Sequence, residues 1–183
     1  TFGGERAYNE FNDVGGNAYI FEYSNSTGQF EYLQAISPNR GGVLRYGQRL
    51  QGSGDIMCVG AWYDPENGQR SGSVYCHKLC DDGTWSLATK IWAPDGSPND
   101  NFGKTVHMDE FFIYVGAPKR SNEGTANRGA LYVYPYELAI QTGPSLNEAA
   151  FSGEAEPNTI QRCSTVPCAV DYNTNQDFYV RCV

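Results

Sequence analysis

The sequence has few of the groups from which catalytic centres are usually built. It contains two histidines, His77 and His107, and it lacks both a Gly-x-Ser-x-Gly nucleophile elbow and a phosphate-binding glycine loop. An active site needs a nucleophile, a base and stabilising groups that converge. The sequence therefore predicts no catalytic residues, no cofactor and a protein that is not an enzyme.

Long apolar runs and positive charge are also scarce. No stretch approaches the eighteen or so apolar residues that cross a bilayer as a helix, so we expect no membrane span. The formal net charge of -8 disfavours binding to nucleic acids, whose phosphates are negative. The chain begins at Thr1 without an initiator Met or a visible secretory signal. We expect a processed chain or a segment of a longer one.

Glycine and tyrosine, in contrast, are abundant, with 21 and 13 copies in 183 residues. Glycine disfavours helices and supports tight turns, and aromatic side chains suit the faces of a pleated sheet. This composition predicts an all-β protein of short strands, large enough for a sizeable core.

Six cysteines and one sequon indicate an extracellular or secreted protein. The even cysteine count fits a disulfide framework, and Asn25-Ser26-Thr27 is an acceptor for N-glycosylation. One pairing places two cysteines on adjacent strands, and another closes a small loop, but the connectivity stays open. Zinc bound by "CHKLC" and "CSTVPC" is the alternative that we consider less favourable. The cysteines are Cys58, Cys76, Cys80, Cys163, Cys168 and Cys182, and the two pairings are Cys58–Cys76 and Cys163–Cys168.

An internal repeat organises most of the chain. Gly16, Gly72 and Gly129 stand 56 and 57 residues apart, and each begins a similar segment: "GNAYIFEY", "GSVYCHKL" and "GALYVYPY". Each segment also has a tyrosine three residues after the glycine. A repeat of this length is typical of modules that bury their faces against their neighbours.

One unit reads as four short strands. Strands are expected at residues 102–108, 111–115 and 131–134, and 85–91 supplies the fourth strand of the preceding unit. Four antiparallel strands per unit are typical of a propeller blade. Small Ala61 and Ala117, with Gly4 in the first copy, would fit the narrow part of a wedge-shaped blade.

The motif "FGKTVHMDEFFIYVGAP" followed by "GALYVY" resembles the FG-GAP repeat, known from the heads of integrin alpha chains. The resemblance covers residues 4 to 136 and implies a secreted β-propeller that adheres and assembles. Many such repeats carry a calcium loop like Asp-x-Asp-x-Asp-Gly, which is missing here, so we expect the non-calcium variety and no metal. Two loops keep calcium as an alternative: one offers Asp64 and Glu66, although Pro65 interrupts them and their spacing is wrong, and the other offers Asp95 and Asp100 in a Gly/Pro turn.

The repeat predicts three parts of the chain. Residues 1–136 would form FG-GAP-like blades, 137–168 an irregular connector or insertion, and 169–183 strands of a further or closing blade. Roughly three units are fewer than the four to eight blades of most propellers. We therefore expect part of a larger propeller, completed by other chains or by copies of this one. Closure of the ring by the C-terminal strands is the alternative.

These features favour a non-catalytic extracellular module for protein–protein interaction, structural assembly or adhesion. One alternative is a lectin-like propeller, in which Trp62, Tyr63 and Trp92 would stack on sugar rings. Another is a fragment of a larger secreted enzyme whose catalytic residues lie elsewhere.

Overall fold

The computed structural model describes residues 2–4, 15–38, 41–121 and 127–136. These residues form an all-β structure, as the composition predicts. Within them, no helix is long and apolar enough to cross a membrane. The strands are β1 (Phe2–Gly4), β2 (Asn17–Ser24), β3 (Gln29–Ile36), β4 (Tyr46–Ser53), β5 (Ile56–Ala61), β6 (Ser73–Leu79), β7 (Trp85–Ile91), β8 (Thr105–Met108), β9 (Phe112–Ala117) and β10 (Ala130–Pro135). The expected connector at 137–168 and the strands expected at 169–183 lie outside the described residues.

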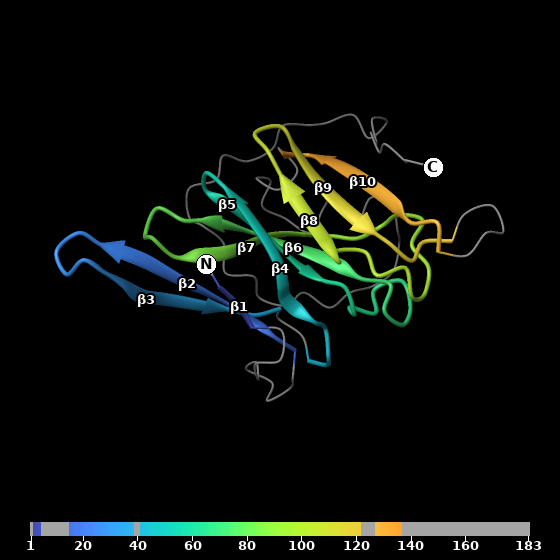
Figure 1. Ribbon diagram of the computed structural model, residues 1–183, viewed down its shortest axis with the longest axis horizontal. Helices are drawn as coiled ribbons and strands as arrows, with labels where there is room; N and C mark the ends of the chain where they lie inside the picture. The colour runs from blue at the N-terminus through green and yellow to red at the C-terminus, as the bar shows by residue number, and fades with distance from the viewer. Residues whose placement is uncertain (1, 5–14, 39–40, 122–126, 137–183) are drawn as a thin grey trace.

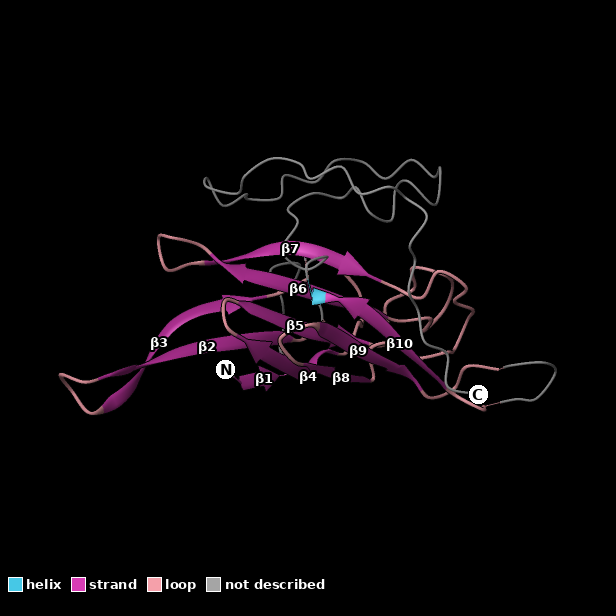
Figure 2. Cartoon of the chain, turned by 90° about the horizontal axis from the view of Figure 1, so that it is seen from above, coloured by secondary structure: helices cyan, strands magenta, loops and turns pink. Residues whose placement is uncertain are grey.

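The strands form three antiparallel sheets that follow one another along the chain. The first sheet has the order β1-β2-β3, the second β4-β5-β6-β7 and the third β10-β9-β8. Strand β4 of the second sheet contacts both β1 and β8, so the three sheets converge along one side (Figure 1). Figure 2 shows the same sheets from above. The second sheet is the four-stranded blade that the repeat predicts.

Strand pairing confirms the repeat residue by residue. Gly4 pairs with Asn17, Ala61 pairs with Ser73, and Ala117 pairs with Ala130, so Gly4 and the two alanines hold the same place in the three sheets. The glycine before each of the three paired strands has a positive φ, of 92° at Gly16, 93° at Gly72 and 77° at Gly129. A left-handed backbone favours glycine, which explains why these residues repeat.

Two hydrophobic cores lie between the sheets, and the second sheet contributes to both. One core contains Ile56 and Cys58 of β5 together with residues of β8, β9 and β10. The other contains Met57, Val59 and Ala61 of β5 together with residues of β2, β3 and β4. Because successive side chains of a strand point to opposite faces, β5 is buried on both sides.

Two glycines permit close contact between the second and third sheets. A Cβ atom on Gly60 would lie 2.1 Å from the carbonyl oxygen of Gly103, and one on Gly72 would lie 2.0 Å from that of Phe102. No side chain fits at these distances. The "FG" of the motif is thus the point at which one sheet approaches the backbone of the next.

A disulfide joins Cys58 and Cys76, which face each other directly on β5 and β6. This is the adjacent-strand pairing that the sequence offers. Cys80 is also disulfide-bonded. Cys163, Cys168 and Cys182 lie outside the described residues, so the expected Cys163–Cys168 loop stays a prediction.

Candidate functional site

The long connections of the three sheets gather at one end, which we call the loop end. In an antiparallel meander the turns alternate between the two ends of the strands. The short hairpin turns after β2, β4, β6 and β8 therefore lie at the opposite, hairpin end (Figure 1). The loop end comprises the described parts of 37–45, 62–72, 92–104 and 118–129. The four acidic residues considered for calcium and the three aromatic residues proposed for ring stacking all lie at the loop end, whereas the glycosylation candidate Asn25 lies at the hairpin end.

Hydrogen bonds connect these loops to one another. The Asn101 amide nitrogen donates to the carbonyl oxygens of Arg70, at 3.1 Å, and Trp62, at 3.4 Å. The backbone N–H of Tyr63 donates to the carbonyl of Leu44 at 3.1 Å. Loops from neighbouring sheets thus form one connected surface, which presents its side chains in fixed positions.

The first acidic pair, Asp64 and Glu66, surrounds a lysine. Asp64 is fully buried and accepts a hydrogen bond of 2.6 Å from the Tyr75 hydroxyl. The Lys90 Nζ lies 3.2 Å from Asp64 Oδ2 and 2.5 Å from Glu66 Oε2. The positive charge of Lys90 compensates the buried carboxylate, which would otherwise be costly to desolvate.

The second acidic pair, Asp95 and Asp100, surrounds an arginine. The Arg120 guanidinium bridges the two, with Nη2 3.1 Å from Asp95 Oδ2 and Nη1 2.7 Å from Asp100 Oδ2. The Tyr132 hydroxyl donates to Asp95 Oδ1 at 2.7 Å. Two effects raise the pKa of Tyr132 well above its usual value: burial contributes most, and this hydrogen bond comes second. The hydroxyl therefore stays protonated.

Both loops considered for calcium therefore hold a cation that the chain itself supplies. Among the described residues, no group of three or more His, Cys, Asp or Glu side chains could hold a metal ion. That the protein works without metal stays a prediction.

The aromatic residues proposed for stacking separate into two places. Trp62 and Tyr63 lie together, with ring centroids 4.1 Å apart. Trp92 lies elsewhere on the loop end, with the Lys90 Nζ 6.0 Å from its ring centroid. Trp62 and Tyr63 thus lie side by side, and Trp92 does not join them in a described ring contact.

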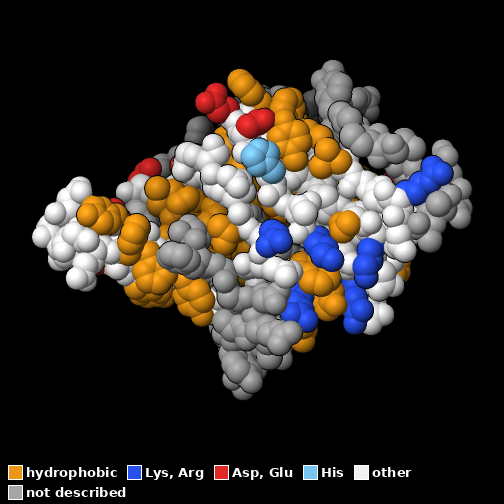
Figure 3. Space-filling model, in the orientation of Figure 1, with side chains coloured by type: hydrophobic (Ala, Val, Ile, Leu, Met, Phe, Trp, Pro, Cys, Tyr) orange, Lys and Arg blue, Asp and Glu red, His pale blue; other side chains and the backbone are white. Residues whose placement is uncertain are grey.

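Three cations surround the Trp62–Tyr63 pair, and sequence reasoning missed them. The guanidinium carbon of Arg45 lies 5.3 Å from the Tyr63 ring centroid and that of Arg70 lies 4.6 Å away. The Lys104 Nζ lies 4.9 Å from the Trp62 ring centroid. Figure 3 shows Lys and Arg side chains gathered on one region, with apolar side chains between them. We call Arg45, Arg70, Lys104, Trp62 and Tyr63 the basic aromatic cluster.

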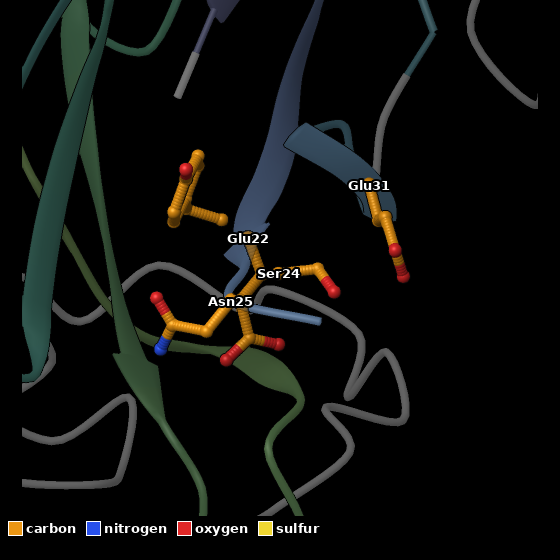
Figure 4. Close-up of a pocket in the computed structure, with 5 residues that line it drawn as sticks. Glu22, Ser24, Asn25 and Glu31 are labelled. Carbon is orange, nitrogen blue, oxygen red and sulfur yellow. The ribbon is translucent and has the colours of Figure 1, made fainter. Parts of the chain in front are cut away.

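Asn25 lies in the turn between β2 and β3, at the hairpin end. Its exposed side chain lines a shallow pocket together with Glu22, Tyr23, Ser24 and Glu31 (Figure 4). Thr27 of the sequon donates its hydroxyl hydrogen to Glu31 Oε1 at 2.8 Å. The position is accessible to a glycan, and glycosylation of Asn25 stays a prediction.

The two histidines do not converge on a shared site. His77 is buried, and its Nε2 lies 2.8 Å from the hydroxyl oxygen of Tyr46. Burial lowers the pKa of His77 to about 3, so the ring is neutral at physiological pH. His107 is exposed on β8, beside the Tyr114 ring.

Comparison with known proteins agrees with this geometry. No curated protein matches the chain. The family model of the FG-GAP repeat matches residues 85–134, which run from the start of β7 to Tyr134 in β10. The match thus spans the last strand of the second sheet and the strands of the third. Residues 85–134 are thus similar to an FG-GAP repeat, in agreement with the sequence motif.

Proposed function

We propose that this chain is a non-catalytic extracellular module for protein–protein interaction and assembly, and that it binds other chains or copies of itself through the open faces of its outer sheets. The FG-GAP repeat supports a role in interaction or adhesion. The Cys58–Cys76 disulfide supports an oxidising compartment.

The observation that carries this proposal is a difference between equivalent residues of neighbouring sheets. Ile56 at the start of β5 is 0% exposed, because the third sheet covers it. Phe112 holds the same place at the start of β9 and is 40% exposed. Its ring packs edge-on against that of Tyr114, and adjoining apolar side chains on an exposed sheet face are typical of a surface that binds another protein. The third sheet thus presents a face of the kind that, in the second sheet, forms a core.

The first sheet also carries exposed aromatic residues. Phe30 is 68% exposed and packs edge-on against Tyr23, and Tyr32 packs in the same way against Phe21. These four rings lie on β2 and β3, towards the hairpin turn. Both outer sheets therefore offer apolar surface for a partner, as expected of a module that assembles sideways.

Sedimentation velocity over a range of protein concentrations tests this proposal. We expect self-association of the wild type, or complex formation with a partner purified from the same source. Phe112→Ser and Tyr32→Ser should each weaken that association. Val43→Ser is the matched control, because Val43 is exposed in the connection before β4 and lies on neither open face. Association that survives both sheet-face variants, or that the control abolishes equally, would contradict the proposal.

A further inference from the structure

We propose that the basic aromatic cluster at the loop end binds an acidic peptide segment of a partner protein. This inference rests on the proposed function, because it assigns a second and chemically different contact to the same interaction module. The contact involves Arg45, Arg70 and Lys104, positioned by Trp62 and Tyr63.

Charge is divided between the two ends of the described structure. Every described Lys and Arg except Lys78 lies at the loop end or in the adjoining half of a strand. The described acidic residues of the loop end belong to the two clusters around Lys90 and Arg120. The other described acidic residues lie toward the hairpin turns: Glu22, Glu31, Asp55, Asp81, Asp82, Asp109 and Glu110. The described part of this acidic protein thus has one positive end, which attracts a negative ligand.

Arg70 and Lys104 contribute positive charge that no carboxylate of the described residues compensates. Neither side chain forms an ion pair among the described residues, whereas Lys90 and Arg120 each have two. Both instead lie against an aromatic ring, Arg70 on Tyr63 and Lys104 on Trp62. Stacking on a ring holds a guanidinium while its N–H edge stays available for a bidentate contact with a carboxylate.

The backbone of the two arginines gives an independent observation. Arg45 and Arg70 both have φ of 57°, in the left-handed region that long side chains disfavour. Their equivalents in the next repeat are Asn101 and Asn127, which also have φ of 57°. Asparagine tolerates this conformation well. The chain therefore places arginine twice where its own repeat shows that asparagine fits, and such strain is typical of functional sites.

The placement of the cations favours a peptide over a saccharide. A sugar would stack on the faces of Trp62 and Tyr63, but charged groups already lie near both rings. The Asn101 bonds to the Trp62 and Arg70 carbonyls also fix the loop from which the rings and Arg70 project. A connected surface with spaced cations suits an extended segment whose Asp and Glu side chains are spaced along it.

Fluorescence anisotropy with a labelled glutamate-rich peptide tests the inference. We expect the wild type to bind the peptide at low salt and to release it as salt screens the charges. Arg45→Asn with Arg70→Asn should weaken binding by about tenfold for each arginine. Because both changes install the residue of the next repeat, the melting temperature should stay the same or rise. The matched control is Lys119→Gln with Arg128→Asn, which removes the same charge from exposed positions outside the cluster and should keep binding.

Three results would overturn the inference. The wild type could fail to bind the peptide, or the arginine variant could bind it as well as the wild type does. A sulfated oligosaccharide could also bind at this cluster while the peptide does not. Phe112→Ser separates this inference from the proposed function, because it should weaken association through the sheet face and leave peptide binding unchanged.

Discussion

The two interfaces between sheets share one aromatic arrangement and differ in its polar groups. In the core between the first and second sheets, Tyr46 of β4 packs edge-on against Tyr75 of β6, with ring centroids 5.6 Å apart. In the core between the second and third sheets, Phe102 packs in the same way against Tyr132 of β10, at 5.3 Å. Tyr46 also contacts the ring of His77, and Phe102 likewise contacts the ring of Tyr134. The repeat thus fixes the shape of the interface and leaves its polarity free to change.

The polar difference has consequences for stability. In the first interface the Tyr46 hydroxyl and the His77 ring form a buried hydrogen bond. In the second, Phe102 has no hydroxyl, and the Tyr134 hydroxyl donates to the Trp92 carbonyl at 3.1 Å. The first interface therefore contains a buried histidine, and the equivalent position in the second is Tyr134. The following variants test that contrast and the packing around it.

The largest effect is expected from Gly72→Ala. A Cβ atom there would collide with the Phe102 carbonyl and would also strain a backbone with positive φ, so we expect a loss of roughly 4 kcal/mol in the free energy of unfolding. Gly129→Ala is the matched change, since its Cβ would lie 3.4 Å from the nearest atom, the Pro118 carbonyl oxygen. It should cost about 1–2 kcal/mol. Urea denaturation measures both, and equal losses would show that close contact between sheets does not set the cost.

Loss of the Cys58–Cys76 disulfide should have the next largest effect. Replacement of both cysteines by alanine removes a cross-link between residues 18 apart, which should lower the free energy of unfolding by about 3 kcal/mol. In the third sheet the equivalent pair is Tyr114 and Val133, which also face each other. Introducing valine at both cysteine positions should recover part of the loss through packing. A change below about 1 kcal/mol in urea denaturation would contradict a stabilising role.

The buried His77 should make stability depend on pH. Its pKa of about 3 in the folded protein lies below the ordinary value of 6.5, so the unfolded state binds the proton more readily. Stability from this group is fully present above pH 6.5 and falls as pH decreases, by at most about 1.4 kcal/mol per pH unit. His77→Gln, which keeps a partner for Tyr46, should flatten the profile between pH 6.5 and 5. Parallel profiles for wild type and variant in thermal unfolding would be evidence against this account.

Removal of single hydroxyls should have the smallest effects and should differ between the interfaces. Tyr46→Phe makes the first interface resemble the second but leaves the buried His77 ring without its partner, at a cost of about 2 kcal/mol. Tyr134→Phe frees a half-buried carbonyl that water can reach, so about 0.5 kcal/mol is expected. Thermal unfolding at pH 7 compares the two. A larger loss from Tyr134→Phe would reverse the proposed ranking.

Much of the fold follows from the spacing of a few residues. The period of Gly16, Gly72 and Gly129 predicts three similar sheets, because each glycine has a conformation that other residues avoid. Cys58 and Cys76 could be assigned to adjacent strands of one sheet, and they form the disulfide. These predictions succeed because they depend on local conformation and on pairing between neighbouring strands.

The loop end could be predicted only in part. The acidic pairs were visible in the sequence, but their cations come from other elements: Lys90 from β7 and Arg120 from the loop after β9. Arg45 and Arg70 lie on different loops, and both lie against the Tyr63 ring. Contacts of this kind depend on how the sheets stack. One signal was nevertheless present in the repeat, since arginine stands where the next copy has asparagine.

The central claim is that the middle sheet is buried by its neighbours while the outer sheets keep an open face. Hydrogen–deuterium exchange at low protein concentration tests it most directly, by comparing peptides from β5 with peptides from β10. We predict that β5 exchanges slowest of the described strands, because both its faces are covered, and that β10 exchanges clearly faster. Protection of β10 equal to that of β5 would contradict the claim.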